Sequence, residues 1–204
     1  MFPLELLFSY ITAVTILVMM PGVDSLLTIT MTKTLNWKAG ILVAVGNLIG
    51  GLSLTIVSSL LIAGFLSMNE TVNTFIQVAS SLYLLRMGWQ IYHSEPCTPK
   101  GHISIKKSKI VTTAIMSNLS NPKALTFFLF LIPQFVTTTS STGMLQQALV
   151  LGFILNVIGF CYLSSLALLA SKIKMSFMQS AHTNKIIGIL FASIAFYLLY
   201  LRFN

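Results

Sequence analysis

The stretch AGILVAVGNLIGGLSLTIVSSLLIAGFL (residues 39–66) contains no charged side chain. A helix needs about 20 mainly apolar residues to cross a hydrocarbon core of about 30 Å, so this stretch predicts a transmembrane helix. The rest of the sequence has the same character, because hydrophobic residues make up 55% and charged residues 8% of the 204. Such a chain cannot cover itself with charge in water, and we expect an integral membrane protein.

Five further apolar stretches are each bounded by charges or small polar clusters, at about residues 4–32, 72–92, 110–136, 144–170 and 185–202. The sequence therefore predicts an all-α fold with six transmembrane helices in a single transmembrane domain, residues 1–204. The last stretch is only just long enough to span, which leaves a count of five open. The first is interpreted as an uncleaved helix, because the N-terminus lacks a basic region and carries Glu5.

The net charge of +8 comes from basic residues that lie almost wholly in the connections. Those after the first, third and fifth helices are Lys33 and Lys38, then Lys100, Lys106, Lys107 and Lys109, then Lys172, Lys174 and Lys185. The opposite connections hold only Glu70 and Arg202. By the positive-inside rule the basic loops are predicted to be cytoplasmic and both termini outside. This pattern fits a lipid bilayer as partner and argues against nucleic-acid binding.

A linker-like connection, residues 93–109, contains Pro96, Pro99 and Gly101 and divides the chain into residues 1–92 and 110–204. Each half holds three predicted helices. Because three is an odd number, the halves must have opposite orientations in the membrane. This is the plan of inverted-repeat transporters, in which sites form at broken helices near the middle of the bilayer.

The first helix of each half contains a proline, in MMPGVDSLLT (residues 19–28) and SNPKALTFF (residues 120–128). Pro21 lies 12 residues before Lys33 and Pro122 lies 13 after Lys109, so both lie roughly 18–20 Å from the basic edge, near the middle of the bilayer. Proline removes a backbone hydrogen bond, and the adjacent Gly22 or Asn121 makes unwinding easier. We predict a break in each helix, with a packing kink as the alternative.

Two ionisable residues follow these prolines, Asp24 and Lys123. A charge in mid-bilayer costs at least about 2.5–3.5 kcal/mol, so such residues usually have a partner or a role. Asp24 is favoured by the start of a helix, whereas Lys123 is not and needs an anion. That anion is either Asp24, in a structural ion pair, or the carboxylate of a substrate. The opposite charges suit a small zwitterion as ligand.

The remaining polar residues carry weaker signals. Asn47, on the glycine-rich second helix, is either structural or lines the path, and Gln77, Asn118 and Asn156 are similar and weaker. Arg86 lies close enough to the end of its helix to reach the interface. His93, Cys97 and His102 share a loop without metal-site spacing, so we predict neither a metal nor a cofactor. The spans lack the residue sets of an enzyme active site.

Four segments resemble the LysE/RhtB family of amino-acid exporters over nearly the whole chain. PGVDSLL (residues 21–27) is similar to the family's PGPxxLL, and AGILVAVGNLIG (residues 39–50) to its glycine-rich second helix. YLLRMGWQIYHS (residues 83–94) resembles its YLLxLGW ending, and SNLSNPKALTFFLFLIPQFV (residues 117–136) its NPKAxxFF…PQF block. The last is the most specific. The sequence departs from the pattern at Val23, in place of the second proline, and at Arg86, where the family is usually uncharged.

The resemblance implies export of amino acids or their derivatives across the inner membrane of a bacterium, driven by the proton motive force. It places Pro21, Asp24, Pro122 and Lys123 at the motif positions. A metal-cation exporter and a non-catalytic subunit of a membrane complex are the alternatives, although one carboxylate is a poor cage for a cation. A homodimer through the last two helices is compatible with their apolar surfaces.

Overall fold

The computed structural model describes residues 4–20, 22–66, 70–94, 105–137, 142–170 and 181–203. All the regular elements in these residues are helices: α1 (Leu4–Val18), α2 (Val23–Thr34), α3 (Trp37–Leu66), α4 (Glu70–Tyr92), η1 (Lys107–Lys109), α5 (Ile110–Leu119), α6 (Pro122–Thr126), η2 (Phe127–Leu131), η3 (Ile132–Phe135), α7 (Met144–Leu169) and α9 (Ala181–Phe203). Each of the predicted apolar stretches is occupied by one or more of them. Pro21, Lys100, Lys172 and Lys174 lie outside the described residues, as does most of the predicted linker, including Cys97 and His102.

Two of the described helices, α3 and α7, are long and apolar enough to cross a membrane. The pair α1 and α2 forms a third candidate if it is taken as one span, bent by 53° at the break. The apolar helical stretches Pro122–Phe135 and Asn184–Tyr200 are shorter. These helices agree with a helical membrane protein, and the count of six complete spans remains a prediction.

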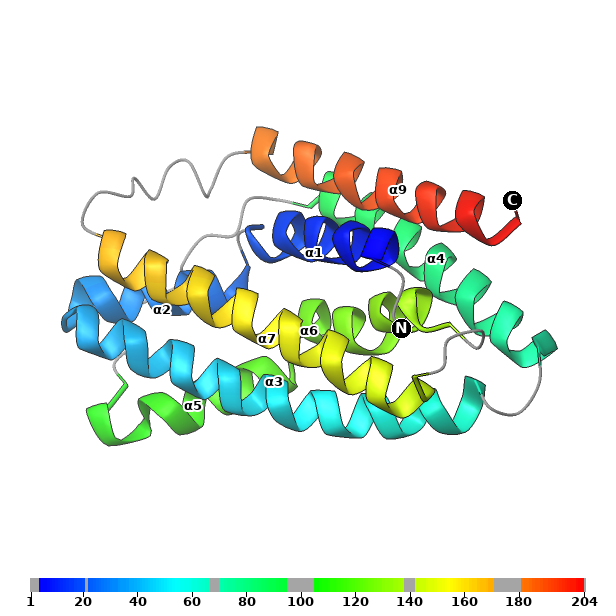
Figure 1. The fold of residues 1–204 in the computed structure, drawn as a ribbon. Coiled ribbons are helices and arrows are strands. Elements are labelled where there is room, and N and C mark those ends of the chain that lie inside the picture. Colours follow the sequence, from blue (N-terminus) through cyan, green and yellow to red (C-terminus); the bar gives the residue numbers. More distant parts are fainter. Residues whose placement is uncertain are drawn as a thin grey trace.

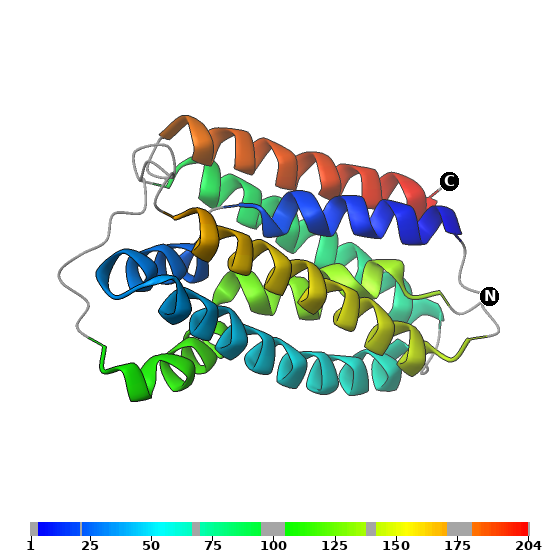
Figure 2. The same cartoon turned by 60° about the vertical axis from the view of Figure 1, so that its left-hand side comes forward.

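The long helices lie side by side in one bundle (Figures 1 and 2). Helix α3 packs against α7 and α5, and α4 packs against α9. The largest hydrophobic cluster joins α1, α4, η2, α7 and α9 through fully buried side chains that include Leu17, Leu84, Leu131, Leu151 and Phe191. The irregular segment α6–η2–η3 is therefore surrounded by packed helices.

Glycines allow the closest helix contacts. A Cβ atom on Gly46 of α3 would lie 2.6 Å from both the Ala114 Cβ and the Val111 carbonyl oxygen of α5. A Cβ on Gly88 of α4 would lie 2.8 Å from the Gly188 carbonyl oxygen of α9, and one on Gly188 would lie 2.6 Å from that of Gly88. Small residues at such crossings let helix backbones approach closely.

One end of the bundle, on the left of Figure 1, gathers the ends of α2, α4 and α7 and the starts of α3, α5 and α9. Several described lysines belong to these helix ends: Lys33, Lys38, Lys107, Lys109 and Lys185. The basic residues of different loops thus share one end, as the order of charges along the sequence predicts. Which side of the membrane this end faces remains a prediction.

Candidate functional site

The first predicted break lies between α1 and α2. Helix α1 ends at Val18, and α2 begins at Val23 after the extended residue Gly22 (φ −155°, ψ −172°). Asp24 lies in the first turn of α2, where the helix dipole favours a negative charge. The interruption leaves the carbonyl oxygens of Met19 and Met20 free to accept hydrogen bonds from side chains.

The second break lies between α5 and α6. Helix α5 ends at Leu119, and Pro122 is the first residue of α6, where a missing N–H does no harm. The Asn121 side chain caps this helix, because its Oδ1 accepts a hydrogen bond from the Lys123 amide at 3.0 Å. Helix α6 then gives way to a π-helical turn, η2, and a 3₁₀ turn, η3. Both predicted interruptions are therefore present at the predicted segments.

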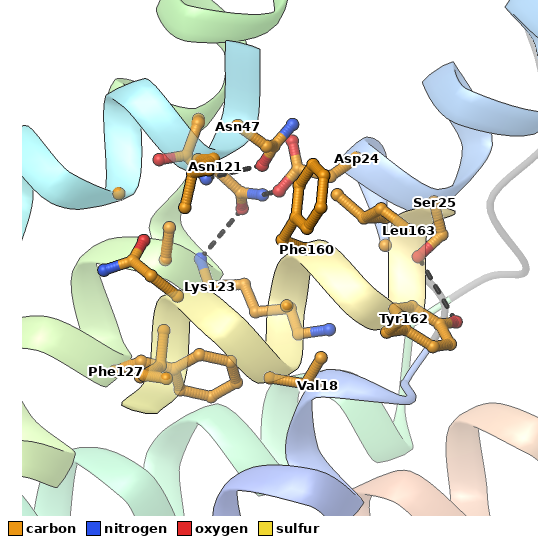
Figure 3. A pocket seen from close by; sticks show the side chains of 18 of the residues that line it. Val18, Asp24, Ser25, Asn47, Asn121, Lys123, Phe127, Phe160, Tyr162 and Leu163 are labelled. Atoms are coloured by element: carbon orange, nitrogen blue, oxygen red, sulfur yellow. Dashed lines mark hydrogen bonds between the residues drawn. The ribbon is translucent and has the colours of Figure 1, made fainter. Parts of the chain in front are cut away.

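Asn121 also joins the two breaks (Figure 3). Its Nδ2 donates a hydrogen bond of 2.8 Å to Oδ2 of Asp24, and Ser117 Oγ lies 3.5 Å from Oδ1 of the same carboxylate. One asparagine thus caps the helix of the second half with its oxygen and holds the carboxylate of the first half with its nitrogen. Two of the predicted site residues, 97 positions apart, are brought into direct contact.

Lys123 does not pair with Asp24, one of the two anions predicted for it, and the other, a substrate carboxylate, stays a prediction. Its Nζ donates a hydrogen bond of 2.7 Å to the carbonyl oxygen of Met20 and lies 5.7 Å from the centre of the Phe127 ring. In the structure Asp24 and Lys123 form no ion pair with each other, and Figure 3 shows their side chains reaching different parts of the pocket. The break itself supplies the partner, because a carbonyl without a helical N–H carries partial negative charge.

Buried asparagines form the third part of the site. Asn118 Nδ2 donates to Asn47 Oδ1 at 2.7 Å, which leaves Asn47 Nδ2 and Asn118 Oδ1 without a well-formed hydrogen bond to the described residues, and both side chains lie within reach of the Asp24 carboxylate. Their residues are only 8% and 7% exposed. Asn156 is satisfied by the protein, since its Nδ2 donates to Thr55 Oγ1 at 2.8 Å and to the Gly152 carbonyl at 2.7 Å. An unpartnered buried donor and acceptor are unusual, and they indicate a place for a polar ligand or water.

These groups line a cavity of about 80 Å³ between the two breaks and helices α3 and α7. The polar part of its wall consists of Asp24, Ser25, Asn47, Asn118, Asn121, Lys123 and Asn156. The apolar part consists of Val18, Phe127, Phe128, Leu155, Phe160 and Leu163. At its edge, Tyr162 donates a hydrogen bond of 3.0 Å to the Met19 carbonyl and accepts one of 3.5 Å from Ser25 Oγ.

The cavity includes five of the residues predicted from the sequence: Gly22, Asp24, Asn47, Asn121 and Lys123. Pro122 is exposed and does not line the cavity, but it begins the helix that carries Lys123. Tyr162 and the aromatic residues of the wall were not predicted, and Asn118 and Asn156 were ranked below Asn47. Among the described residues no group of three His, Cys, Asp or Glu side chains could hold a metal ion.

A helical membrane protein whose two interrupted helices enclose a small cavity with a carboxylate and an ammonium group has the construction of a membrane carrier. Comparison with known families agrees with this class. The chain belongs to the LysE type translocator family, whose family model matches residues 15–202. The resemblance found in the sequence is thereby confirmed. The chain is a multi-pass membrane transporter and not an enzyme.

Several curated relatives cover nearly the whole chain. The leucine efflux protein of Salmonella typhimurium is 26% identical in an alignment of 200 positions that covers 92% of this chain and 91% of that protein. The leucine efflux protein of Enterobacter sp. is 25% identical in an alignment of 195 positions that covers 92% of each chain. That of Klebsiella pneumoniae is 23% identical in an alignment of 194 positions that covers 92% of this chain and 91% of that protein. No solved structure is significantly similar to the chain.

Proposed function

We propose that this protein is a secondary carrier that exports an aliphatic amino acid across the inner membrane of a bacterium, driven by the proton motive force. The observation that carries the proposal is the cavity between the two helix breaks, which presents one carboxylate, one ammonium group and an apolar wall. A zwitterionic amino acid with an apolar side chain matches all three. The leucine efflux proteins among the relatives support the same class of substrate.

The two charged residues have distinct roles in this proposal. The substrate carboxylate binds to Lys123 Nζ and replaces the Met20 carbonyl, which holds that ammonium group at 2.7 Å. The substrate ammonium binds to Asp24, whose carboxylate Asn121 already orients. Charge-assisted hydrogen bonds of this kind are about twice as strong as neutral ones, and they strengthen where water is excluded. The unpartnered Asn47 Nδ2 and Asn118 Oδ1 supply a further donor and acceptor.

The apolar wall selects the side chain. Phe127, Phe128 and Leu155 are at least nine-tenths buried and border the cavity. Transfer of a leucine side chain to such a site stabilises the complex by about 1.5–3 kcal/mol. The cavity, about 80 Å³, is well below the roughly 300 Å³ at which pockets for drug-sized ligands begin. It therefore favours a single small amino acid over a peptide.

The carrier architecture proposed is six spans in two inverted repeats, residues 1–92 and 110–204, joined by the linker 93–109. Each repeat has the same order: a broken helix, a long helix and a third helix. Equivalent elements pack together, α3 with α7 and α4 with α9, as expected for elements related by a two-fold axis. Reciprocal contacts of Gly88 and Gly188 support the same relation.

The basic end of the bundle is proposed to be cytoplasmic, with both termini outside. Fusion of alkaline phosphatase to the C-terminus would test this orientation, because the enzyme is active only when exported. An inactive phosphatase fusion together with a fluorescent C-terminal green fluorescent protein fusion would contradict it.

Export from cells loaded with leucine-containing dipeptides tests the function and the site together. We expect the wild type to release leucine faster than the strain without the protein. Asp24→Asn and Lys123→Met should each lower the rate at least tenfold, since a hydrogen bond to a charged group contributes about 1.5–3 kcal/mol. Lys38→Met is the matched control, because Lys38 is exposed at the basic end of the bundle.

Normal export by both site variants, at equal protein level in the membrane, would refute the assigned site. Release of no amino acid above the background strain by the wild type would refute the function. An uncoupler that collapses the proton gradient should abolish export against a concentration gradient, and undiminished export in its presence would exclude the proposed coupling.

A further inference from the structure

A second hollow of the described structure lies on the outer surface of the bundle, and none of its wall residues borders the cavity at the breaks. It is a groove of about 510 Å³ between α4 and α9. Its wall consists of Leu85, Arg86, Gly88, Trp89 and Tyr92 of α4 and Gly188, Ile189, Ala192 and Phe196 of α9. Apart from one residue, Arg86, this wall carries no charge.

Arg86 is exposed in this apolar wall and makes no hydrogen bond or ion pair with any described residue. It lies six residues before the end of α4 at Tyr92, about 9 Å along the helix axis, a distance that a long side chain can bridge towards the interface. A guanidinium group that reaches the interface in this way lies at the level of the lipid phosphates, which are the anions that a bilayer offers there.

A second cation lies beside the other end of the α4 wall, which runs from Leu85 to Tyr92. Lys185 Nζ lies 6.0 Å from the ring centre of Tyr92, which is part of the wall. The start of α9 is tied to the end of α4, because Asn184 Nδ2 donates to the Ser94 carbonyl at 3.1 Å and to Ser94 Oγ at 3.2 Å. The two cations therefore border one groove, Arg86 beside Leu85 and Lys185 beside Tyr92.

We propose that this groove binds an anionic phospholipid, with the phosphate between Arg86 and Lys185 and an acyl chain along Gly188, Ala192 and Phe196. A guanidinium group presents a planar fork of donors that matches phosphate. Basic pockets between transmembrane helices are typical sites for anionic headgroups. Trp89 and Tyr92, at the same end of α4, are the residue types that lie at headgroup level.

The charge of the groove decides between lipid and protein as occupant. Trp89 is 68% and Phe196 is 62% exposed, so either a lipid or a second copy of this chain could cover them. A second copy that used the same groove would bury Arg86 against this apolar wall, and burial of a charge there is destabilising. A phospholipid covers the apolar surface and supplies the anion as well.

The two tryptophans of the chain make a direct test possible, because Trp37→Phe leaves Trp89 as the only one. Lipids brominated near the headgroup end of the acyl chain quench tryptophan fluorescence on contact. The purified Trp37→Phe protein is titrated with brominated phosphatidylglycerol and with brominated phosphatidylcholine in the same micelles. If each cation contributes about 1 kcal/mol, the anionic lipid should bind about 25-fold more tightly.

The double substitution Arg86→Gln and Lys185→Gln should abolish this preference. The control is the double substitution Lys38→Gln and Lys106→Gln, which removes the same charge from the same end of the bundle and should keep the preference. Equal quenching by the two lipids, or an unchanged preference after the Arg86 and Lys185 substitutions, would overturn the proposal. Displacement by soluble glycerol phosphate would show a free anion as the occupant. If Trp89 is shielded from both lipids in a cross-linked dimer, a second copy of the chain occupies the groove instead.

Discussion

Single side chains at the breaks connect the two halves of the protein. Asn121 caps α6 through its oxygen and holds Asp24 through its nitrogen. Lys123 and Tyr162 each donate to a carbonyl freed by the first break, those of Met20 and Met19. The two carbonyl groups that lack a helical partner at the first break are thus bound by side chains from the other half of the chain. Substrate binding at Lys123 would change how the first break is held.

Two tyrosine hydroxyls that donate to backbone carbonyls give a matched prediction. Tyr162→Phe should lower the leucine export rate about threefold to tenfold, because one net hydrogen bond contributes about 0.5–1.5 kcal/mol and this one holds the break. Tyr10→Phe also removes a hydroxyl. This hydroxyl donates a hydrogen bond of 2.8 Å to the Leu151 carbonyl, which does not border the cavity. This substitution should lower the melting temperature and leave export within twofold. Export at the wild-type rate for Tyr162→Phe would contradict the role of the break.

At the scale of elements, α3 organises the cavity. Its two faces pack on α5 and α7, so that Asn47 meets Asn118 on one side and Thr55 meets Asn156 on the other. The close approach to α5 depends on Gly46, whose missing side chain leaves room for the Val111 carbonyl. The spacing of helices around the cavity is therefore set by glycine rather than by large apolar side chains.

Gly46→Ala should separate α3 from α5. The added methyl group would lie 2.6 Å from backbone that cannot move aside, and overpacking of this kind costs about 1–3 kcal/mol. Gly64→Ala, on the same helix, adds a methyl group with no atom within 4 Å, so it should preserve or slightly raise stability. Thermal melting of the detergent-solubilised variants measures both. Equal melting temperatures would show that the α3–α5 contact is not tight.

The sequence predicted the helices and the two breaks because these depend on local chemistry: the length of apolar runs and proline geometry. It did not predict that Lys123 binds the Met20 carbonyl or that Tyr162 lies at the cavity edge. Helices such as α3 and α7 are apolar on all sides, so the pattern contains no face that fixes their rotation. Which asparagine faces the cavity is decided by packing among distant segments.

At the scale of the whole molecule, each half of the chain contributes a broken helix, a long helix and a third helix around one cavity. The broken helices meet at the cavity, and the pairs α3–α7 and α4–α9 pack around them (Figures 1 and 2). In such a carrier, rocking of one half against the other exposes a fixed site to either side of the membrane. The residues that we propose to bind substrate, Asp24, Asn121 and Lys123, also belong to the contacts between the halves.

The most direct test of this account is the affinity of the purified protein for leucine, leucinamide and N-acetyl-leucine, measured by direct binding of the radiolabelled compounds. Leucinamide lacks the carboxylate and N-acetyl-leucine lacks the ammonium group, so the wild type should bind each at least about tenfold more weakly than leucine. Lys123→Met should lose the discrimination against leucinamide alone, and Asp24→Asn that against N-acetyl-leucine alone. Variants that keep the wild-type preference for leucine over both analogues would contradict it.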